Sequence, residues 1–541
     1  MRSLRGAADA GKSIRWAGLA GGLALLALLS WALPAQAVTF RWSNDGDAVA
    51  MEPYFFNETF SLGFMSNVYD PFVIRDKELK IAPSLAESWK RIDPLTWEFQ
   101  LRKGVKFHDG TPFTSADVVF SYNRVTSAGS DLKANFISIA SVEATGPYTA
   151  VIKTKVPNPI LLSYLTTWEI MSKKWCEDNK AVDVADIRKG QENFAIRHAN
   201  GTGAFMLVSR EADVKTVLKR NPDWWGWKTG LGTSNVDEVV FTPIKQDATR
   251  VAALLSGDVD MIYSLPIQDA GRVKANGDKV YQQPETRTVF LGLDQKRDEL
   301  LESDVKGKNP FKDRRVRLAL YQAIDENSIV RSIMKGAATP ATDMVVPFVT
   351  GFDPDMKRYP YDPDAAKKLL AEAGYPNGFS IGFDCPNDRY VNDAEICQAV
   401  TAMWAKIGVK ANLLAQTKSI FFAKILARKT SAFMLGWTPA TLDTLDALDN
   451  LLYTNDASNS MGRFNLGSFN SPKLDSLADQ ARTEFNVEKR TRLLQEGLDE
   501  AQREVATIPL HYQVVVWASS AKVDLTQLST NYFEWYWVEK K

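Results

Sequence analysis

Residues 96–120 read TWEFQLRKGVKFHDGTPFTSADVVF. At the start of this stretch the apolar side chains of Trp97, Phe99 and Leu101 alternate with polar ones. A period of two is typical of a half-buried strand, and Gly104 interrupts it. The stretch therefore predicts a strand that ends near this glycine.

The second half of the stretch predicts a turn and then a helix. Asp109-Gly110 is a turn dipeptide. Thr114, followed three residues later by Asp117 and then by the apolar run Val118–Phe120, is typical of a capped helix start. Strand, turn and helix in this order predict a mixed α/β fold.

The rest of the chain repeats these signals without an internal repeat. Asp362-Pro363 and Asp313 are helix starts, each followed by apolar residues at helical spacing. The apolar runs Val289–Leu293 and Val514–Trp517 predict buried strands. Since no low-complexity linker occurs, we expect the domains to be joined by ordered crossings.

The N-terminus predicts export. A basic start precedes the apolar run Ala17–Leu33, and Pro34-Ala-Gln-Ala37 follows it. This order is typical of a secretory signal peptide, here residues 1–37, cleaved after Ala37. The alternative is a retained membrane anchor, which needs about 20 apolar residues. We therefore expect a mature protein in the periplasm.

Composition excludes several partners. The chain has 65 Lys and Arg, 65 Asp and Glu, and 3 His. Near-neutral charge without a basic block argues against nucleic acid or an anionic membrane surface as partner. No nucleophile or zinc motif with the required spacing occurs, so no enzymatic activity, metal or cofactor is predicted.

Three cysteines occur, none in a C-x-x-C motif. In an oxidising compartment two of them can pair. We predict a disulfide between Cys385 and Cys397, because a short loop and one helical turn can join them. Cys176 is then a lone thiol, expected to be buried.

Five segments together resemble one family. They are residues 96–120, Gly201–Gly203, Asn221–Gly226, Ala253–Asp260 and Phe311–Asp325. In this order they resemble the extracellular solute-binding proteins of family 5, which serve ABC importers of peptides and nickel. The resemblance covers nearly all of the chain beyond the leader.

The resemblance implies a two-lobed α/β clamp of the cluster C type, with an extra domain on the first lobe. Lobe one is expected at 38–76, 200–291 and 510–541, the extra domain at 77–199, and lobe two at 292–509. The chain is expected to cross between lobes near Leu291–Asp294 and Pro509–Tyr512. The implied partners are a small-molecule or peptide ligand and an inner-membrane permease, with the binding protein itself a monomer.

The resemblance also implies an anion-binding arginine. The segment from Cys385 to Asp393 is similar to the one that holds a peptide carboxylate, which makes Arg389 the candidate anchor and Tyr390 its neighbour in the site. A guanidinium offers paired donors to a carboxylate and stays charged when desolvated. The alternative is an ion pair of Arg389 with Asp388 or Asp393.

At the amine-binding position the chain departs from its relatives. Peptide binders carry an aspartate three residues after the tryptophan of a Gly-Trp pair, where this chain has Ala440. Asp443 is the candidate substitute, whereas Asp446 and Asp449 continue at a spacing typical of a solvated helix face. Peptide, amino-acid conjugate, opine-like compound and sugar derivative therefore all stay open as ligands.

Aromatic residues complete the predicted site. Trp437 is expected to form an apolar wall and Tyr54 to contribute from the N-terminal segment. The tail Phe533–Trp537 is expected to brace the fold. Two other functions stay open: a sensor adaptor that presents ligand to a chemoreceptor, and a periplasmic amidase-type enzyme.

Overall fold

The computed structural model describes residues 37–541 except 187–188, 388 and 457–460. The chain divides into two compact units, Met1–Val38 and Thr39–Lys541, and the second carries the fold. The predicted signal peptide lies, apart from Ala37, outside the described residues. Among the described residues, none of the helices has the length and apolar character needed to span a bilayer.

A mixed sheet of eleven strands forms the centre of the second unit. Its order is β15-β14-β16-β12-β17-β11-β1-β10-β9-β8, and β13 pairs with β17 off this path. The strands are β1 (Thr39–Ser43), β8 (Phe205–Glu211), β9 (Lys215–Arg220), β10 (Glu238–Phe241), β11 (Met261–Ile262), β12 (Lys279–Leu293), β13 (Ala338–Pro340), β14 (Phe379–Pro386), β15 (Val409–Gln416), β16 (Ala432–Trp437) and β17 (Ile508–Ser519).

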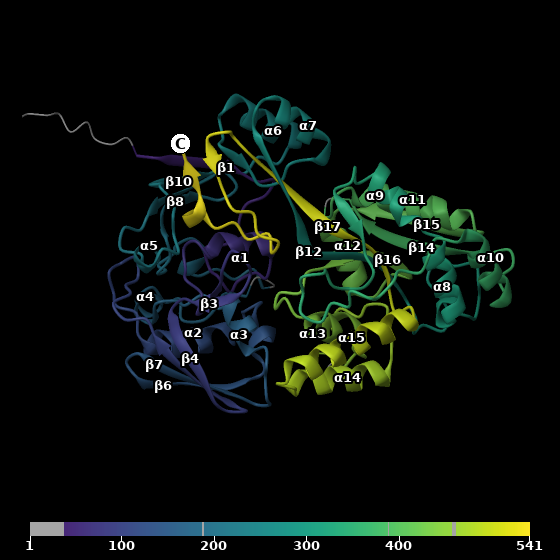
Figure 1. Ribbon diagram of the computed structural model, residues 1–541, viewed down its shortest axis with the longest axis horizontal. Coiled ribbons are helices and arrows are strands. Elements are labelled where there is room, and N and C mark those ends of the chain that lie inside the picture. Colours follow the sequence, from purple (N-terminus) through teal and green to yellow (C-terminus); the bar gives the residue numbers. More distant parts are fainter. Residues whose placement is uncertain (1–36, 187–188, 388, 457–460) are drawn as a thin grey trace, which may run out of the picture. The chain divides into compact units, whose positions relative to one another are not determined.

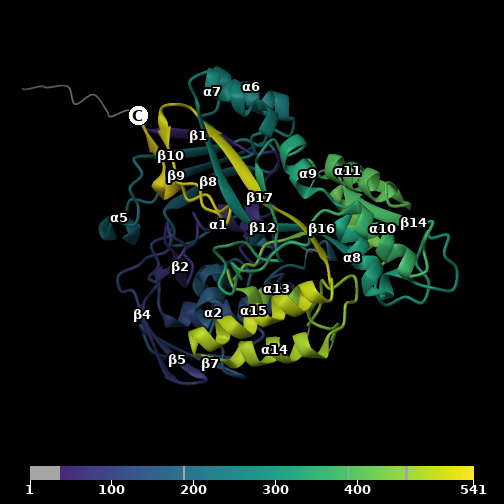
Figure 2. The same ribbon diagram turned by 45° about the vertical axis from the view of Figure 1, so that its right-hand side comes forward.

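Two long antiparallel strands, β12 and β17, join the two halves of this sheet, and both views show them side by side (Figures 1 and 2). Strand β17 pairs with β11 at one end, whereas β12 takes β16 as a further neighbour from Thr288 onward. The pairing register of β12 shifts between Pro284 and Thr288. We call the half with β1 and β8–β11 lobe one and the half with β14–β16 lobe two; the domain boundaries expected from the sequence stay a prediction.

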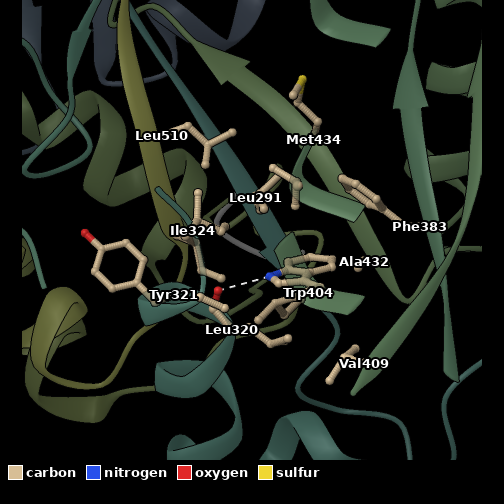
Figure 3. Close-up of a cluster of buried hydrophobic side chains, with 14 of the residues drawn as sticks. Leu291, Leu320, Tyr321, Ile324, Phe383, Trp404, Val409, Ala432, Met434 and Leu510 are labelled. Atoms are coloured by element: carbon tan, nitrogen blue, oxygen red, sulfur yellow. Dashed lines mark hydrogen bonds between the residues drawn. The ribbon is translucent and has the colours of Figure 1, made fainter. Parts of the chain in front are cut away.

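The core of lobe two is built as the sequence signals predict. Helices α8 (Arg314–Gln322) and α10 (Pro363–Glu372) begin at Asp313 and Asp362, whose side chains accept backbone N–H bonds. Figure 3 shows Trp404 of α11 (Asp393–Ala405) among buried apolar side chains, its Nε1 donating to the Leu320 carbonyl at 3.0 Å. The remaining helices beyond β12 are α9 (Glu326–Ser332), α12 (Lys418–Leu426), α13 (Thr444–Ala447), α14 (Pro472–Thr483) and α15 (Val487–Arg503).

Residues 96–120 contribute one strand to a separate four-stranded sheet and form a helix beyond it. Strand β5 spans Thr96–Leu101, with Trp97, Phe99 and Leu101 buried, which confirms the predicted alternation. Helix α2 (Ser115–Val125) begins with the Thr114–Asp117 capping box. The sheet order is β4 (Ala86–Asp93), β5, β7 (Thr149–Thr154) and β6 (Ile139–Gly146), and α3 (Leu161–Tyr164) and α4 (Lys173–Asp178) follow.

The other elements complete lobe one and its edges. They are α1 (Thr59–Met65), β2 (Val73–Arg75), β3 (Ile81–Pro83), α5 (Trp225–Thr229), α6 (Asp247–Ser256), α7 (Ala270–Ala275), β18 (Val523–Asp524) and β19 (Glu539–Lys540). The mixed α/β fold predicted from the sequence is thereby confirmed.

Candidate ligand-binding cavity

A cavity of about 470 Å³ is lined by residues of both lobes. This volume falls in the range of small-molecule sites, which form preferentially where domains meet. The lining residues fall within the segments 57–79, 131–135, 166–167, 286–287, 389–390, 422–426, 435–450, 463–466 and 528–536. The cavity wall thus combines lobe one, lobe two, the strand β12 between them and the four-stranded sheet region.

A basic corner of the cavity is built around Tyr390. Its hydroxyl accepts the Gly436 backbone N–H at 2.8 Å, and the guanidinium carbons of Arg389 and Arg287 lie 5.3 and 5.8 Å from its ring centroid. A side chain at position 436 would place its Cβ 2.7 Å from the Tyr390 ring, which explains the glycine there. The Asp393 carboxylate accepts the backbone N–H groups of Arg389 and Tyr390 and fixes this loop.

The two arginines of this corner differ in their partners. Arg287 is neutralised by Glu285, with Nη2 and Oε1 3.0 Å apart, and Gln513 donates to the same carboxylate. The guanidinium of Arg389 has no hydrogen-bond or ion-pair partner among the described residues. Burial, and then the charge of Arg287, lower the pKa of Arg389 from its usual value, yet an arginine stays protonated in proteins. Arg389 therefore presents a positive charge to the cavity that no described residue neutralises. Asp388, one of the two partners considered for it, lies outside the described residues.

Trp437 lines the cavity beside this corner. Its ring lies 5.0 Å from that of Phe464, and its Nε1 donates to Asp446 at 2.8 Å. The indole ring thus forms an apolar part of the cavity wall, while its N–H group is hydrogen-bonded to the Asp446 carboxyl group.

Asp446 is the middle one of three aspartates at a spacing of three residues. Asp443 is paired with Arg490 and Asp449 with Arg482. Asp446 has no basic partner among the described residues and lines the cavity at 9% exposure. Burial, together with the two neighbouring carboxylates, raises the pKa of Asp446 to about 7. The interpretation of Asp446 as part of a solvated helix face is wrong, because its side chain is buried and forms part of the cavity wall.

The structure places neither Asp443 nor Tyr54 on the cavity wall. Asp443 is 3% exposed, and both of its carboxylate oxygens accept hydrogen bonds from Arg490. Tyr54 is fully buried and donates its hydroxyl to the Glu169 carbonyl. Of the five ligand-contact candidates, Arg389, Tyr390 and Trp437 are brought together at the cavity.

Sequence reasoning missed several charged residues of the wall, among them Arg287 and Glu534. Arg287 follows Glu285 just before the apolar run Val289–Leu293, and this charged pair was the available signal. Glu534 belongs to the tail expected only to brace the fold; it is 6% exposed and accepts from the Ser66 hydroxyl at 3.1 Å. Burial raises the pKa of Glu534 to about 8.

The cysteines are arranged as follows. Cys385 at the end of β14 and Cys397 in α11 are joined by a disulfide. Cys176 is a buried free thiol, and burial raises its pKa to about 12. Within the described ranges, no group of three or more His, Cys, Asp or Glu side chains is placed to hold a metal ion.

Two lobes joined by a pair of long strands, with a ligand-sized cavity lined by both, are the features of a solute-binding protein. The family model for the bacterial extracellular solute-binding proteins, family 5, matches residues 80–459. The chain belongs to this family.

Curated relatives cover most of the chain. Heme-binding protein A of Haemophilus influenzae is 28% identical over 459 residues, which are 80% of this chain and 79% of the relative. The glutathione-binding protein GsiB of Escherichia coli K12 is 26% identical over 508 residues, 92% and 93% of the two chains.

Solved structures share the two-lobed fold. HbpA2 from Haemophilus parasuis superposes with a TM-score of 0.76 at 24% identity, covering 93% of this chain and all of that one. CtaP from Listeria monocytogenes, an ABC transporter substrate-binding protein, gives a TM-score of 0.79 at 20% identity, covering 93% of this chain and 99% of that one. The predicted family and the two-lobed fold class are confirmed.

Proposed function

We propose that this chain is the substrate-binding component of an ABC importer and captures a small zwitterionic solute that carries at least one carboxylate. The observation that carries the proposal is that a guanidinium and a carboxyl group, those of Arg389 and Asp446, line one cavity and have no ion-pair partner among the described residues. Arg389 binds the carboxylate and Asp446 binds an ammonium group. Trp437, with Phe464 beside it, forms the apolar wall between polar anchors.

The chemistry of the relatives' ligands agrees with this assignment. Glutathione is a peptide-like zwitterion with free carboxylates, and heme carries propionate carboxylates. A carboxylate is the group common to both, and a guanidinium with an open pair of donors is the side chain best suited to it. Arg389, which has no ion-pair partner in the described part of the chain, therefore fits either ligand class, and Asp446 favours the one with an amine.

Transport follows from closure of the two lobes. A ligand held by both lobes gains its full set of contacts only in the closed state, so it shifts the population toward that state. The inner-membrane permease then takes up the solute from the closed, monomeric binding protein. The protein carries out no chemistry of its own, and bonds within the solute stay intact.

The compartment is part of the proposal. A signal peptide cleaved after Ala37 delivers the chain to the periplasm. Mass spectrometry of the protein from a periplasmic extract should find Val38 as the first residue. An intact leader on the exported protein would contradict this.

The experiment that tests the function is native mass spectrometry of the purified protein, followed by calorimetry with the solute found. We expect a carboxylate-bearing zwitterion that binds one to one and leaves unchanged. Conversion of that solute into product, or the absence of any binding solute, would contradict the proposal.

A further inference from the structure

The four-stranded sheet region also touches lobe two outside the cavity. We call residues 86–164 the small-sheet domain; they carry β4–β7, α2 and α3. In both views α13–α15 of lobe two lie next to this domain (Figures 1 and 2). The side chains that make these contacts do not line the cavity; they are Arg91, Phe485, Ile160 and Tyr164.

The first contact joins Arg91 of β4 to Phe485, in the turn between α14 and α15. The guanidinium carbon lies 3.8 Å from the centroid of the phenyl ring. This is the geometry of a cation–π contact, in which the ring face attracts the positive charge. The two residues lie far apart in the chain, so the contact exists only while the small-sheet domain and lobe two are together.

The second contact is apolar. Ile160, directly before α3, is 8% exposed and belongs to a buried cluster whose other described members all come from residues 290–512. Tyr164, at the end of α3, packs against the same cluster. Burial, and then the carboxylate of Asp446, raise the pKa of the Tyr164 hydroxyl. The Tyr164 hydroxyl is therefore near enough to the Asp446 carboxyl group for the two to interact electrostatically.

A third link lies on the cavity wall and shows that the lobes meet there as well. Arg75 of β2 donates to the carbonyl of Thr441 in lobe two and to the Leu79 carbonyl in its own lobe, each at 2.8 Å. Since Arg75 lines the cavity, a bound solute can compete for it. Such competition cannot affect the contacts of Arg91, Ile160 and Tyr164 directly.

We propose that the small-sheet domain is a closure latch, which holds lobe two through Arg91, Ile160 and Tyr164 and sets the fraction of closed protein before any solute binds. The apparent affinity for a solute is scaled by the fraction of protein in the binding-competent state. Through these three residues, which do not line the cavity, the latch changes the apparent affinity for a solute.

The test measures the distance between the lobes without a ligand. Spin labels are placed at Val208→Cys in β8 and Leu414→Cys in β15, which lie at opposite ends of the large sheet and are 56% and 43% exposed. Cys176 is buried, so labelling without reductant is directed to the introduced cysteines and keeps the disulfide. Bound solute is first stripped in denaturant, and distances are then measured by pulsed electron paramagnetic resonance.

The latch variant is Arg91→Ala with Tyr164→Ala. Its matched control is Lys103→Ala with Tyr148→Ala, which removes a cation–aromatic pair (5.9 Å) inside the same domain. We expect the long-distance population to rise by a factor of about 3 or more in the latch variant, as loss of one exposed cation–π contact alone predicts. The control should match the unmodified protein.

Equal distance distributions in the latch variant and the control would overturn the proposal. So would an unmodified protein that is entirely in the long-distance form. If Tyr164→Ala fails to fold, the contact between Arg91 and Phe485 can be tested by itself. Phe485→Ala should raise the long-distance population as much as Arg91→Ala does. The double variant should show no further rise, since both substitutions remove the same contact. Additive effects of these two substitutions would contradict the latch.

Discussion

Both terminal nitrogens of Arg490 donate to the carboxylate of Asp443, at 2.6 and 2.7 Å. The pair is almost fully buried, so Asp443 is committed to α15 and unavailable to a ligand. Asp446, one helical turn further on, has no such partner among the described residues. The same three-residue spacing thus gives one aspartate a structural role and its neighbour a place in the cavity wall.

The first prediction separates these two aspartates. Asp443→Ala leaves a buried guanidinium unpaired and should lower the free energy of unfolding by about 3–5 kcal/mol. Asp446→Asn removes no ion pair and should leave the unfolding midpoint in urea near its original value while weakening the binding of an amine-bearing solute. Denaturant titration and calorimetry check both; equal stability losses in the two variants would contradict the assignment.

The second prediction concerns Arg389. Arg389→Ala should weaken binding of a carboxylate-bearing solute by about 1.5–3 kcal/mol, the value of a hydrogen bond to a charged group. Calorimetry with the co-purifying solute measures this. Arg272→Ala, at an exposed helix position outside the cavity, is the control and should bind as the unmodified protein does. Unchanged affinity in Arg389→Ala would mean that this arginine only supports the loop.

The third prediction concerns the pH dependence of stability. Burial, reinforced by the charge of Asp70, raises the pKa of Glu534 from 4.5 to about 8, although bonds from Ser66 and Tyr536 oppose the shift. Between these values the folded state holds a proton that the unfolded state has lost. The contribution of Glu534 to stability is therefore complete below pH 4.5 and is lost as the pH rises through about 8.

Glu534→Gln isolates this contribution, because other carboxyl groups titrate in both proteins. The difference in unfolding free energy between variant and unmodified protein should change in favour of the variant from pH 5 to about 8 and then level off. Urea unfolding at a series of pH values measures it. A difference that does not vary with pH would show that Glu534 ionises normally in the folded protein.

The fourth prediction concerns the cysteines. Peptide mapping without reductant should recover a linked peptide that contains Cys385 and Cys397 and a separate peptide with Cys176. Reduction removes the cross-link that restricts the unfolded chain. It should therefore lower the free energy of unfolding by about 3 kcal/mol for a loop of this length. Cys176→Ala is the control and should keep the same dependence on reductant. A linked peptide that contains Cys176 would contradict the pairing.

The sequence alone determined the local structure and the family. Strand β5 and the capped start of α2 follow from residues a few positions apart, because side-chain alternation and helix capping depend on neighbours in the chain. The helix starts at Asp313 and Asp362 follow for the same reason. The ordered motifs then predicted the family. They also led to Arg389, Tyr390 and Trp437, which the structure places on the cavity wall.

Only the tertiary structure decided which charges are free to meet a ligand. Asp443 and Asp446 are equivalent by sequence spacing, and what distinguishes them is Arg490, which comes from a distant helix. Glu534 enters the cavity wall because the C-terminal tail packs beside α1, a contact between opposite ends of the chain. Whether a buried charge is compensated depends on partners brought together by folding, and such partners leave no periodic pattern in the sequence.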